Sequence, residues 1–348
     1  MSTAANAERA GRPLVPRAHS LCAVLRKVLG RLLGRLSRKR LLVPFRERAA
    51  PAKIAVKSVG HTYRGRGQVV ALENVNLDIH HGQMVCLLGP SGCGKSTLLY
   101  ALAGTVEPSG GHVTIDGKEV KGPGPDRLLM FQDHALFPWL TVRQNIVFAL
   151  RARGLDRREC ERRAHEYIHL VQLDGFERSL PHQLSGGMRQ RASLARALSM
   201  DPAVLLMDEP FGALDAQTRG QMHGLLQQIW MRKRKTVVFV THDIREALVL
   251  GDRVVVMAGR PGRILWDLEV RLERPRDPDD ERLVTLSRQI RTALREAQAQ
   301  SRPMAGAGGE GRENAEELDG AGSGSSLDGG AAAGGVPHPA GAHLGAGG

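Results

Sequence analysis

GPSGCGKST, residues 89–97, is the stretch that decides the fold of this 348-residue chain. An apolar run, Met84–Leu88, precedes it and a helical run, Leu98–Ala103, follows it, which is the setting that a phosphate loop requires. The three glycines let the backbone curl so that N–H groups and a helix N-terminus face an anion. Lys95 adds a positive charge, and Ser96 offers a hydroxyl to Mg²⁺. The pattern predicts a binding site for a nucleoside triphosphate; the alternative, a glycine-rich turn without a ligand, is disfavoured by the flanking strand and helix.

The predicted nucleotide contacts cover the whole motif: Gly89, Pro90, Ser91, Gly92, Cys93, Gly94, Lys95, Ser96 and Thr97.

Two acidic residues follow a second apolar run, Ala203–Met207. Asp208 would lie near Mg²⁺, and Glu209, one step further, could activate a water molecule. Adjacent side chains on a strand point to opposite faces, so the two carboxylates need different roles. The pair predicts the metal-binding and base positions of a nucleotide-hydrolysing site, with a solvated acidic turn as the alternative.

Between Ile54 and Leu272, short β-rich runs alternate with longer helical patterns. Examples of these runs are Met84–Leu88, Val204–Met207 and Thr236–Val240. This alternation is typical of a mostly parallel sheet flanked by helices, so we expect an α/β fold. The hydrophobic content of 42% is enough for a buried core.

A signature segment, Leu184-Ser-Gly-Gly-Met188, completes a set of motifs whose order and spacing resemble those of ABC ATPases. The set consists of the phosphate loop, Gln132, Leu184–Met188, Asp208-Glu209, Gly212-Ala-Leu-Asp215 and His242. The resemblance extends from about Lys53 to Asp267, roughly three-fifths of the chain. It implies a P-loop NTPase of the ABC cassette type, with a RecA-like core, an antiparallel β subdomain and a helical signature subdomain. It also implies ATP and Mg²⁺ as cofactors.

The resemblance gives roles to three further positions. Tyr63 resembles the aromatic residue that stacks on adenine, with an ordinary strand aromatic as the alternative. Gln132 resembles the residue that senses Mg²⁺ and the attacking water and ties catalysis to a transporter partner. His242 resembles the switch histidine that contacts the γ-phosphate, with a structural histidine as the alternative. The implied catalytic residues are Glu209, His242 and Gln132, and the implied metal contacts are Ser96, Gln132 and Asp208.

In the signature segment, Ser185, Gly186 and Gly187 precede a helical run, so a helix N-terminus is available to an anion. By resemblance, that anion is the γ-phosphate held by a second copy of the chain. Two copies would then close head-to-tail around two ATP molecules, with Asp215 at the contact. Met188 stands where most of the family has Gln, and we expect this change to be tolerated because the serine and glycines carry the anion contact.

Three features resemble the nitrate, sulfonate and taurine group of bacterial importers: the segment Phe131–Thr141, the methionine of the signature, and the segment Arg260–Ile264. In the first of these, Phe137, Pro138 and Trp139 follow Gln132 at the place where, by resemblance, a permease inserts its coupling helix. A local core cluster is the alternative.

The two ends of the chain differ from its body. Residues 1–50 hold twelve Lys or Arg and two Asp or Glu, so most of the net charge of +13 lies there. Within them, residues 21–36 have the spacing of a basic amphipathic helix. Attachment to anionic lipid, an unstructured extension and a wrongly chosen start codon all fit this arm. Nucleic-acid binding fits it less well, because aromatics interleaved with the basic residues, which single-strand binding would favour, are absent. Residues 301–348 contain fifteen glycines and no Phe, Trp or Tyr, so we expect disorder there.

These patterns predict four segments. They are a basic N-terminal extension (1–50), the nucleotide-binding domain (51–272), a C-terminal helical extension (273–300) and a disordered tail (301–348). The four cysteines are too few and too scattered for a disulfide framework, and no stretch reaches the roughly 18 apolar residues of a spanning helix. We expect a chain in a reducing compartment that neither crosses a membrane nor is secreted.

The leading hypothesis is the ATP-hydrolysing subunit of an importer for nitrate, an aliphatic sulfonate or taurine; the alternatives are an ABC ATPase of a different transporter class and a soluble ABC-type regulatory ATPase. The chain would bind a membrane-spanning permease at the cytoplasmic side of the cell inner membrane, serve an external solute-binding protein indirectly, and bind no nucleic acid. Soluble ABC proteins of translation or DNA repair are disfavoured, because the chain has one phosphate loop and no sustained heptad run. A regulator without turnover would be expected to lack the base or the switch histidine, and Glu209 and His242 are both present.

Overall fold

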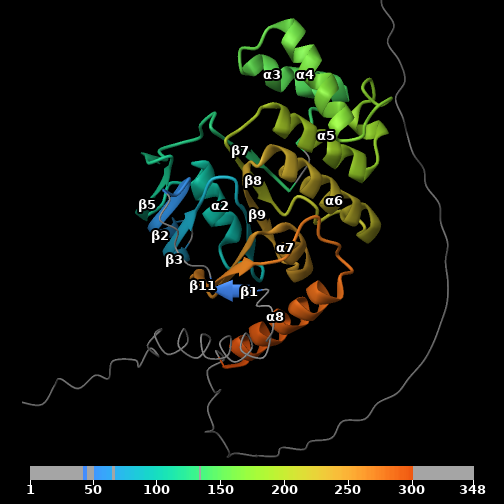
Figure 1. The fold of residues 1–348 in the computed structure, drawn as a ribbon. Coiled ribbons are helices and arrows are strands. Elements are labelled where there is room, and N and C mark those ends of the chain that lie inside the picture. The colour runs from blue at the N-terminus through green and yellow to red at the C-terminus, as the bar shows by residue number, and fades with distance from the viewer. Residues whose placement is uncertain (1–41, 45–50, 65–66, 133–134, 301–348) are drawn as a thin grey trace, which may run out of the picture. The chain divides into compact units, whose positions relative to one another are not determined.

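Seven strands form the larger of two sheets, in the order β1-β11-β10-β4-β9-β8-β7 (Figure 1). The strands from β10 to β7 in this order run parallel, whereas β11 pairs antiparallel with both β10 and β1. Their bounds are β1 (Leu42–Pro44), β4 (Met84–Leu88), β7 (Arg127–Met130), β8 (Val204–Asp208), β9 (Thr236–Thr241), β10 (Arg253–Ala258) and β11 (Arg263–Val270). The computed structural model describes residues 42–44, 51–64, 67–132 and 135–300.

A second, antiparallel sheet has four strands in the order β3-β2-β5-β6. Its strands are β2 (Ile54–Arg64), β3 (Gln68–Ile79), β5 (Gly110–Ile115) and β6 (Lys118–Glu119). The described helices are α2 (Lys95–Ala103), α3 (Val142–Ala152), α4 (Arg157–Leu170), the short 3₁₀ helix η1 (Pro181–Gln183), α5 (Gly186–Ser199), α6 (Ala216–Lys233), α7 (Ile244–Leu250) and α8 (Glu281–Gln300).

Strand β4 separates two hydrophobic cores. Met84, Cys86 and Leu88 face a core built mainly with α3 to α8, while Val85 and Leu87 face a second core built with α2 and the four-stranded sheet. All five residues of β4 are buried, which explains why the strand is a continuous apolar run rather than an alternating one.

Polar residues fix the starts of the helices near the site. Thr141 and Gln144 form a reciprocal capping box at α3, and α3, α4 and α5 pack against one another as a helical subdomain (Figure 1). Ser185 caps α5, and Asp215 caps α6. The residues that the sequence singled out as motif positions therefore also set where these helices begin.

The predicted α/β fold is confirmed, with its RecA-like sheet, antiparallel β subdomain and helical subdomain. The sequence predicted that the domain begins at Pro51, but β1 precedes that residue and pairs with β11, a long-range contact that a three-residue run does not reveal. At the other end, α8 lies in the predicted helical extension and buries Leu283, Leu286 and Ile290 against the larger core.

The predicted amphipathic helix of residues 21–36 and the tail of residues 301–348 lie outside the described residues. Among the described helices, none combines the length and the apolar character needed to span a membrane.

Candidate nucleotide site

Five neighbouring parallel strands end at one edge of the large sheet, and residues able to bind a ligand or take part in catalysis lie at the end of each. β4 leads into the phosphate loop, β8 ends at Asp208, and β9 leads to His242. Gln132 follows β7, and Arg260 follows β10. Because the carboxyl ends of parallel strands share an edge, residues far apart in the sequence meet here.

A cavity of about 530 Å³ lies at this edge. Its walls are the phosphate loop, the facing parts of β2 and β3, and the ends of β7, β8 and β10. The lining residues are Tyr63, Val69, Val70, Ala71, Ser91, Gly92, Gly94, Lys95, Ser96, Thr97, Gln132, Asp208, Glu209 and Arg260. The structure therefore brings most of the predicted nucleotide, metal and base positions into one space.

Lys95 is held inside the loop that it belongs to. Its ammonium donates hydrogen bonds to the carbonyl oxygens of Gly89 (2.9 Å) and Pro90 (3.0 Å) and lies 4.0 Å from a carboxylate oxygen of Glu209. Only 4% of the side chain is exposed. A fixed, desolvated cation in a loop of backbone N–H groups is suited to binding phosphate.

Cys93 is the one loop residue whose side chain points into the protein core. The thiol is buried among the residues of the smaller core, and burial raises its pKa. Its predicted contact with the nucleotide can therefore involve only the backbone.

Asp208 accepts two side-chain hydrogen bonds, from the Ser96 hydroxyl (2.9 Å) and from the Tyr100 phenol (2.8 Å). Burial, with a further contribution from the bond to Asp208, raises the pKa of Tyr100 to about 12, so the phenol keeps its proton and donates. Ser96 and Asp208 lie side by side and suit Mg²⁺, which usually takes few protein ligands and completes its shell with phosphates and water. Tyr100 was not predicted, although it follows Ser96 by four residues on one helix and so shares its face.

Replacing Tyr100 by Phe should raise the Mg²⁺ concentration that supports half-maximal ATP hydrolysis by about tenfold, because Asp208 loses the bond that orients it. Tyr63→Phe is the matched control, since its phenol lies 3.3 Å from Thr97 and not on Asp208. A Mg²⁺ titration of both variants decides the matter, and an equal response of the two would contradict an orienting role for Tyr100.

Glu209 lines the cavity and pairs with His242, which is not itself a lining residue. The His242 Nδ1 atom lies 2.9 Å from a Glu209 carboxylate oxygen, and Glu209 is mostly shielded, with 22% of its side chain exposed. The backbone of Glu209 turns with a φ of 42°, held by the bond from its N–H to the Val240 carbonyl. A shielded carboxylate beside a histidine and near Lys95 can accept a proton from a water molecule in the cavity.

The Tyr63 ring faces the cavity rather than the core. It is 44% exposed, stands edge-on to His61 at a centroid distance of 4.6 Å, and places its hydroxyl near Thr97. Because an exposed ring that lines the cavity is free to stack on a base, this position favours adenine stacking over strand packing.

The signature residues Ser185, Gly186 and Gly187 do not line the cavity. The Ser185 hydroxyl accepts a hydrogen bond from the N–H of Met188 (3.3 Å), which caps α5. A Cβ atom on Gly187 would overlap the methyl group of Thr218, so the signature packs closely on the start of α6. One copy of the chain thus supplies a phosphate loop and a signature segment, but not at the same site.

Asp215 lies at that same contact between the signature and α6. It accepts hydrogen bonds from the N–H (2.9 Å) and the hydroxyl (2.7 Å) of Thr218. The backbone bond from Thr218 is the main reason why the pKa of the Asp215 carboxyl lies below its usual value. The residue is therefore ionised and fixed at an exposed helix start.

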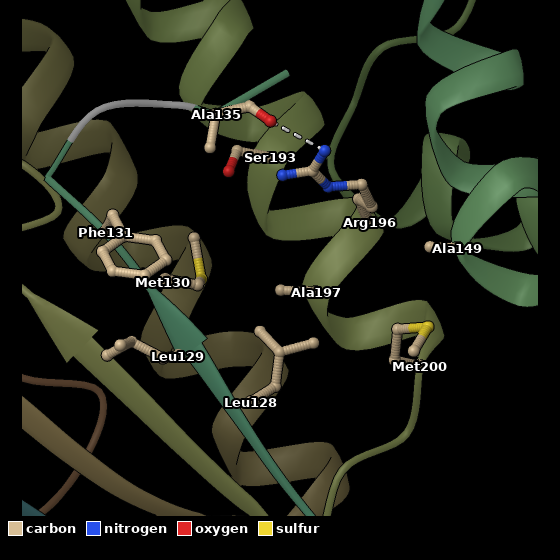
Figure 2. Close-up of a pocket in the computed structure, with 10 residues that line it drawn as sticks. All are labelled: Leu128, Leu129, Met130, Phe131, Ala135, Ala149, Ser193, Arg196, Ala197 and Met200. Atoms are coloured by element: carbon tan, nitrogen blue, oxygen red, sulfur yellow. Dashed lines mark hydrogen bonds between the residues drawn. The ribbon is translucent and has the colours of Figure 1, made fainter. Parts of the chain in front are cut away.

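A second, mostly apolar groove of about 190 Å³ lies between β7, α3 and α5 (Figure 2). Its lining residues are Leu128, Leu129, Met130, Phe131, Ala135, Ala149, Ser193, Arg196, Ala197 and Met200. Figure 2 shows Arg196 donating a hydrogen bond to the carbonyl oxygen of Ala135 (2.9 Å).

Next to this groove, Phe137, Trp139 and Phe148 form an aromatic patch. The centroid of the Phe137 ring lies 5.6 Å from that of Trp139 and 4.9 Å from that of Phe148. The Cζ atom of Arg196 lies 5.8 Å from the Phe137 centroid. Trp139 is 71% exposed and Phe148 is 53% exposed. This exposure favours a contact surface over the local core cluster.

Arg260 is the charged residue of the cavity that the sequence patterns did not predict; the apolar lining residues Val69, Val70 and Ala71 were not predicted either. In the sequence, the segment Arg260–Ile264 indicates only a transporter group, although an apolar run ending at Met257 precedes it. A basic residue just beyond a predicted parallel strand was the signal that could have placed it at the site.

Comparison with known proteins gives a consistent answer. The family model described as ABC transporter matches residues 72–212. An uncharacterized ABC transporter ATP-binding protein of Methanocaldococcus jannaschii is 49% identical over 226 residues, which are 65% of this chain and 85% of that protein. The nitrate import ATP-binding protein NrtD of Synechocystis sp. is 46% identical, covering 64% of this chain and 84% of that protein. The taurine import ATP-binding protein TauB of Pseudomonas syringae pv. tomato is 49% identical, with shares of 63% and 84%.

Among solved structures, the fold resembles the dimeric structure of MJ0796, a bacterial ABC transporter cassette. The TM-score is 0.57 with 34% sequence identity, and the match covers 63% of this chain and 100% of that cassette.

Proposed function

The chain belongs to the ABC transporter ATP-binding family and hydrolyses ATP, and we propose that two copies share their active sites while driving a membrane importer. The observation that carries the proposal is the separation of the signature segment from the cavity within one copy. A capped helix N-terminus is suited to binding an anion. Only a second copy, placed head-to-tail, would bring it to the phosphates.

In the shared site, the loop amides and Lys95 bind the β- and γ-phosphates, and Tyr63 stacks on adenine. Ser96, Asp208 and Gln132 would hold Mg²⁺, which would offset the negative charge of the phosphates. Glu209 accepts the proton of the attacking water, and His242 contacts the γ-phosphate. The remaining contacts come from the second copy, through Ser185, Gly186 and Gly187, with Asp215 at the interface between the copies.

The transported solute belongs to the class of small oxyanions that includes nitrate, aliphatic sulfonates and taurine. The names of the relatives support this class, since both a nitrate import protein and taurine import proteins match at 46% identity or more. The chain would act at the cytoplasmic side of the cell inner membrane, with a separate permease and, indirectly, an external solute-binding protein.

The permease contact fits the groove of Figure 2 together with the aromatic patch. Both are apolar, and the exposed rings of Trp139 and Phe148 would be covered by a docked helix. Gln132 follows β7, the strand that lines the groove, and itself lines the nucleotide cavity. Movement of the permease helix could therefore act on the site through this residue.

Trp139→Ala should remove most of the stimulation of hydrolysis by the reconstituted permease, while hydrolysis without permease stays within about twofold, because large exposed aromatics often dominate contact energy. The matched control is Phe176→Ala, which truncates an exposed ring outside the patch. Full stimulation in Trp139→Ala would place the permease elsewhere.

Uptake of labelled nitrate, taurine and an alkanesulfonate by cells that carry the chain and its permease tests the substrate class. Uptake of at least one of these should depend on the chain and be lost with Glu209→Gln. If none of them depended on the chain while ATP hydrolysis was intact, the importer assignment would be wrong and the ATPase assignment would stand.

A further inference from the structure

The turn that joins β10 to β11 packs backbone against backbone on the phosphate loop. A Cβ atom on Gly262, in this turn, would overlap the carbonyl oxygen of Cys93 in the loop. Gly262 also pairs with β3, donating to Ala71 (2.9 Å) and accepting from the N–H of Glu73 (3.1 Å). The turn is therefore fixed between the phosphate loop and a strand that lines the nucleotide cavity.

Two arginines of this turn region have different surroundings. Arg263 forms an ion pair with Glu73 at 2.6 Å and does not line the cavity. Arg260 lines the cavity together with Lys95 and Ser96, and a Cβ atom built on Gly92 would lie 2.7 Å from its Nη2 atom. Within the described part of the chain, no hydrogen bond or ion pair involves the Arg260 guanidinium. An exposed cation without a partner thus lies against the phosphate loop, inside the nucleotide cavity.

We propose that Arg260 binds the phosphate chain of ATP and serves as a second cation beside Lys95. The planar guanidinium presents several N–H donors in a fixed fork, which matches phosphate oxygens better than a point charge does. Lys95 is buried within the loop, whereas Arg260 reaches the cavity from a turn about 165 residues later in the chain. The β10–β11 turn gives Arg260 a rigid support, so less conformational freedom is lost when the phosphate binds.

A purely structural role would be different. In such a role, Arg260 would pack on Gly92 and maintain the shape of the loop without touching the nucleotide. Loss of this packing would weaken the binding of every ligand of the cavity alike, whereas loss of a phosphate contact would weaken the binding only of ligands that carry phosphates. The number of phosphates on the ligand therefore separates the two roles.

The test measures binding of ATP, ADP, adenosine and inorganic tripolyphosphate to the full chain and to three variants, by competition with a fluorescent ATP analogue. Arg260→Ala should weaken ATP, ADP and tripolyphosphate by about tenfold and leave adenosine within about twofold. Arg260→Lys, which keeps the charge but not the fork, should fall between the wild type and Arg260→Ala. Arg263→Ala is the matched control, with the same charge lost three residues away, and should bind all four ligands within about twofold of the wild type.

Unchanged ATP and tripolyphosphate binding in Arg260→Ala would overturn the proposal, and so would an equal loss for adenosine, which would assign the residue to the loop alone. A loss for adenosine without one for tripolyphosphate would move the contact to the nucleoside and also overturn it. The role of Arg260 rests on the proposed nucleotide binding at this cavity, and the wild type tests that premise separately. If the wild type bound no ATP, the site itself would be wrong, whatever Arg260 does.

Discussion

Glu209→Gln should lower the rate of ATP hydrolysis by about a hundredfold or more and leave ATP binding close to that of the wild type. The amide has the shape of the carboxylate and can keep the contact with His242, which lies 2.9 Å away in the structure. It cannot accept a proton from water, so the chemical step loses its base. Phosphate release under steady-state conditions measures the rate, and equilibrium titration with ATP measures the binding.

Glu119→Gln, which changes an exposed carboxylate on β6, is the control for a general effect of the substitution. Turnover within a few-fold of the wild type in Glu209→Gln would show that another group takes the proton. Loss of ATP binding in the same variant would instead point to a structural role for the carboxylate near Lys95.

Lys95→Ala should weaken ATP binding by about a hundredfold, because the variant lacks the cation that the loop holds for the phosphates. The ammonium also bonds to the carbonyl oxygens of Gly89 and Pro90, so part of the loss reflects a loop that is less well ordered. Fluorescent-analogue binding reports the affinity, and thermal unfolding shows whether the fold is intact.

Lys118→Ala removes an equal charge from an exposed residue and should bind ATP normally. If a folded Lys95→Ala protein kept its affinity for ATP, the assignment of residues 89–97 as the phosphate-binding loop would be contradicted.

Much of the site could be predicted because its parts are local. The phosphate loop, the Asp208-Glu209 pair and His242 each come after an apolar run that is long enough to indicate a strand, and the carboxyl ends of parallel strands lie at one edge of a sheet. Loop residues, Asp208 and Glu209 line one cavity, and His242 contacts Glu209, which agrees with that reasoning. The separation of Ser185 from this cavity agrees with a site shared between copies.

The parts that could not be predicted depend on contacts between distant segments. β1 has three residues and exists because β11 offers it an edge, a pairing between residues more than 220 positions apart. Arg260 reaches the phosphate loop only because β10 lies beside β4 in the sheet. The groove of Figure 2 is formed by β7, α3 and α5 together, so the sequence of any one of these segments does not predict it. Tyr100 is different: it follows Ser96 by four residues on one helix, and this shared face could have predicted that Tyr100 lies near Asp208.

The measurement that tests the shared active site most directly is sedimentation of Glu209→Gln with and without ATP. The chain has a mass of 37.7 kDa, and we expect a monomer without nucleotide or with ADP and a dimer of about twice that mass with ATP. ATP would be held between the phosphate loop of one copy and Ser185, Gly186 and Gly187 of the other, and the variant hydrolyses this ligand too slowly to separate the copies during the measurement. A monomer at saturating ATP, or a dimer of the same strength in all conditions, would contradict the shared site.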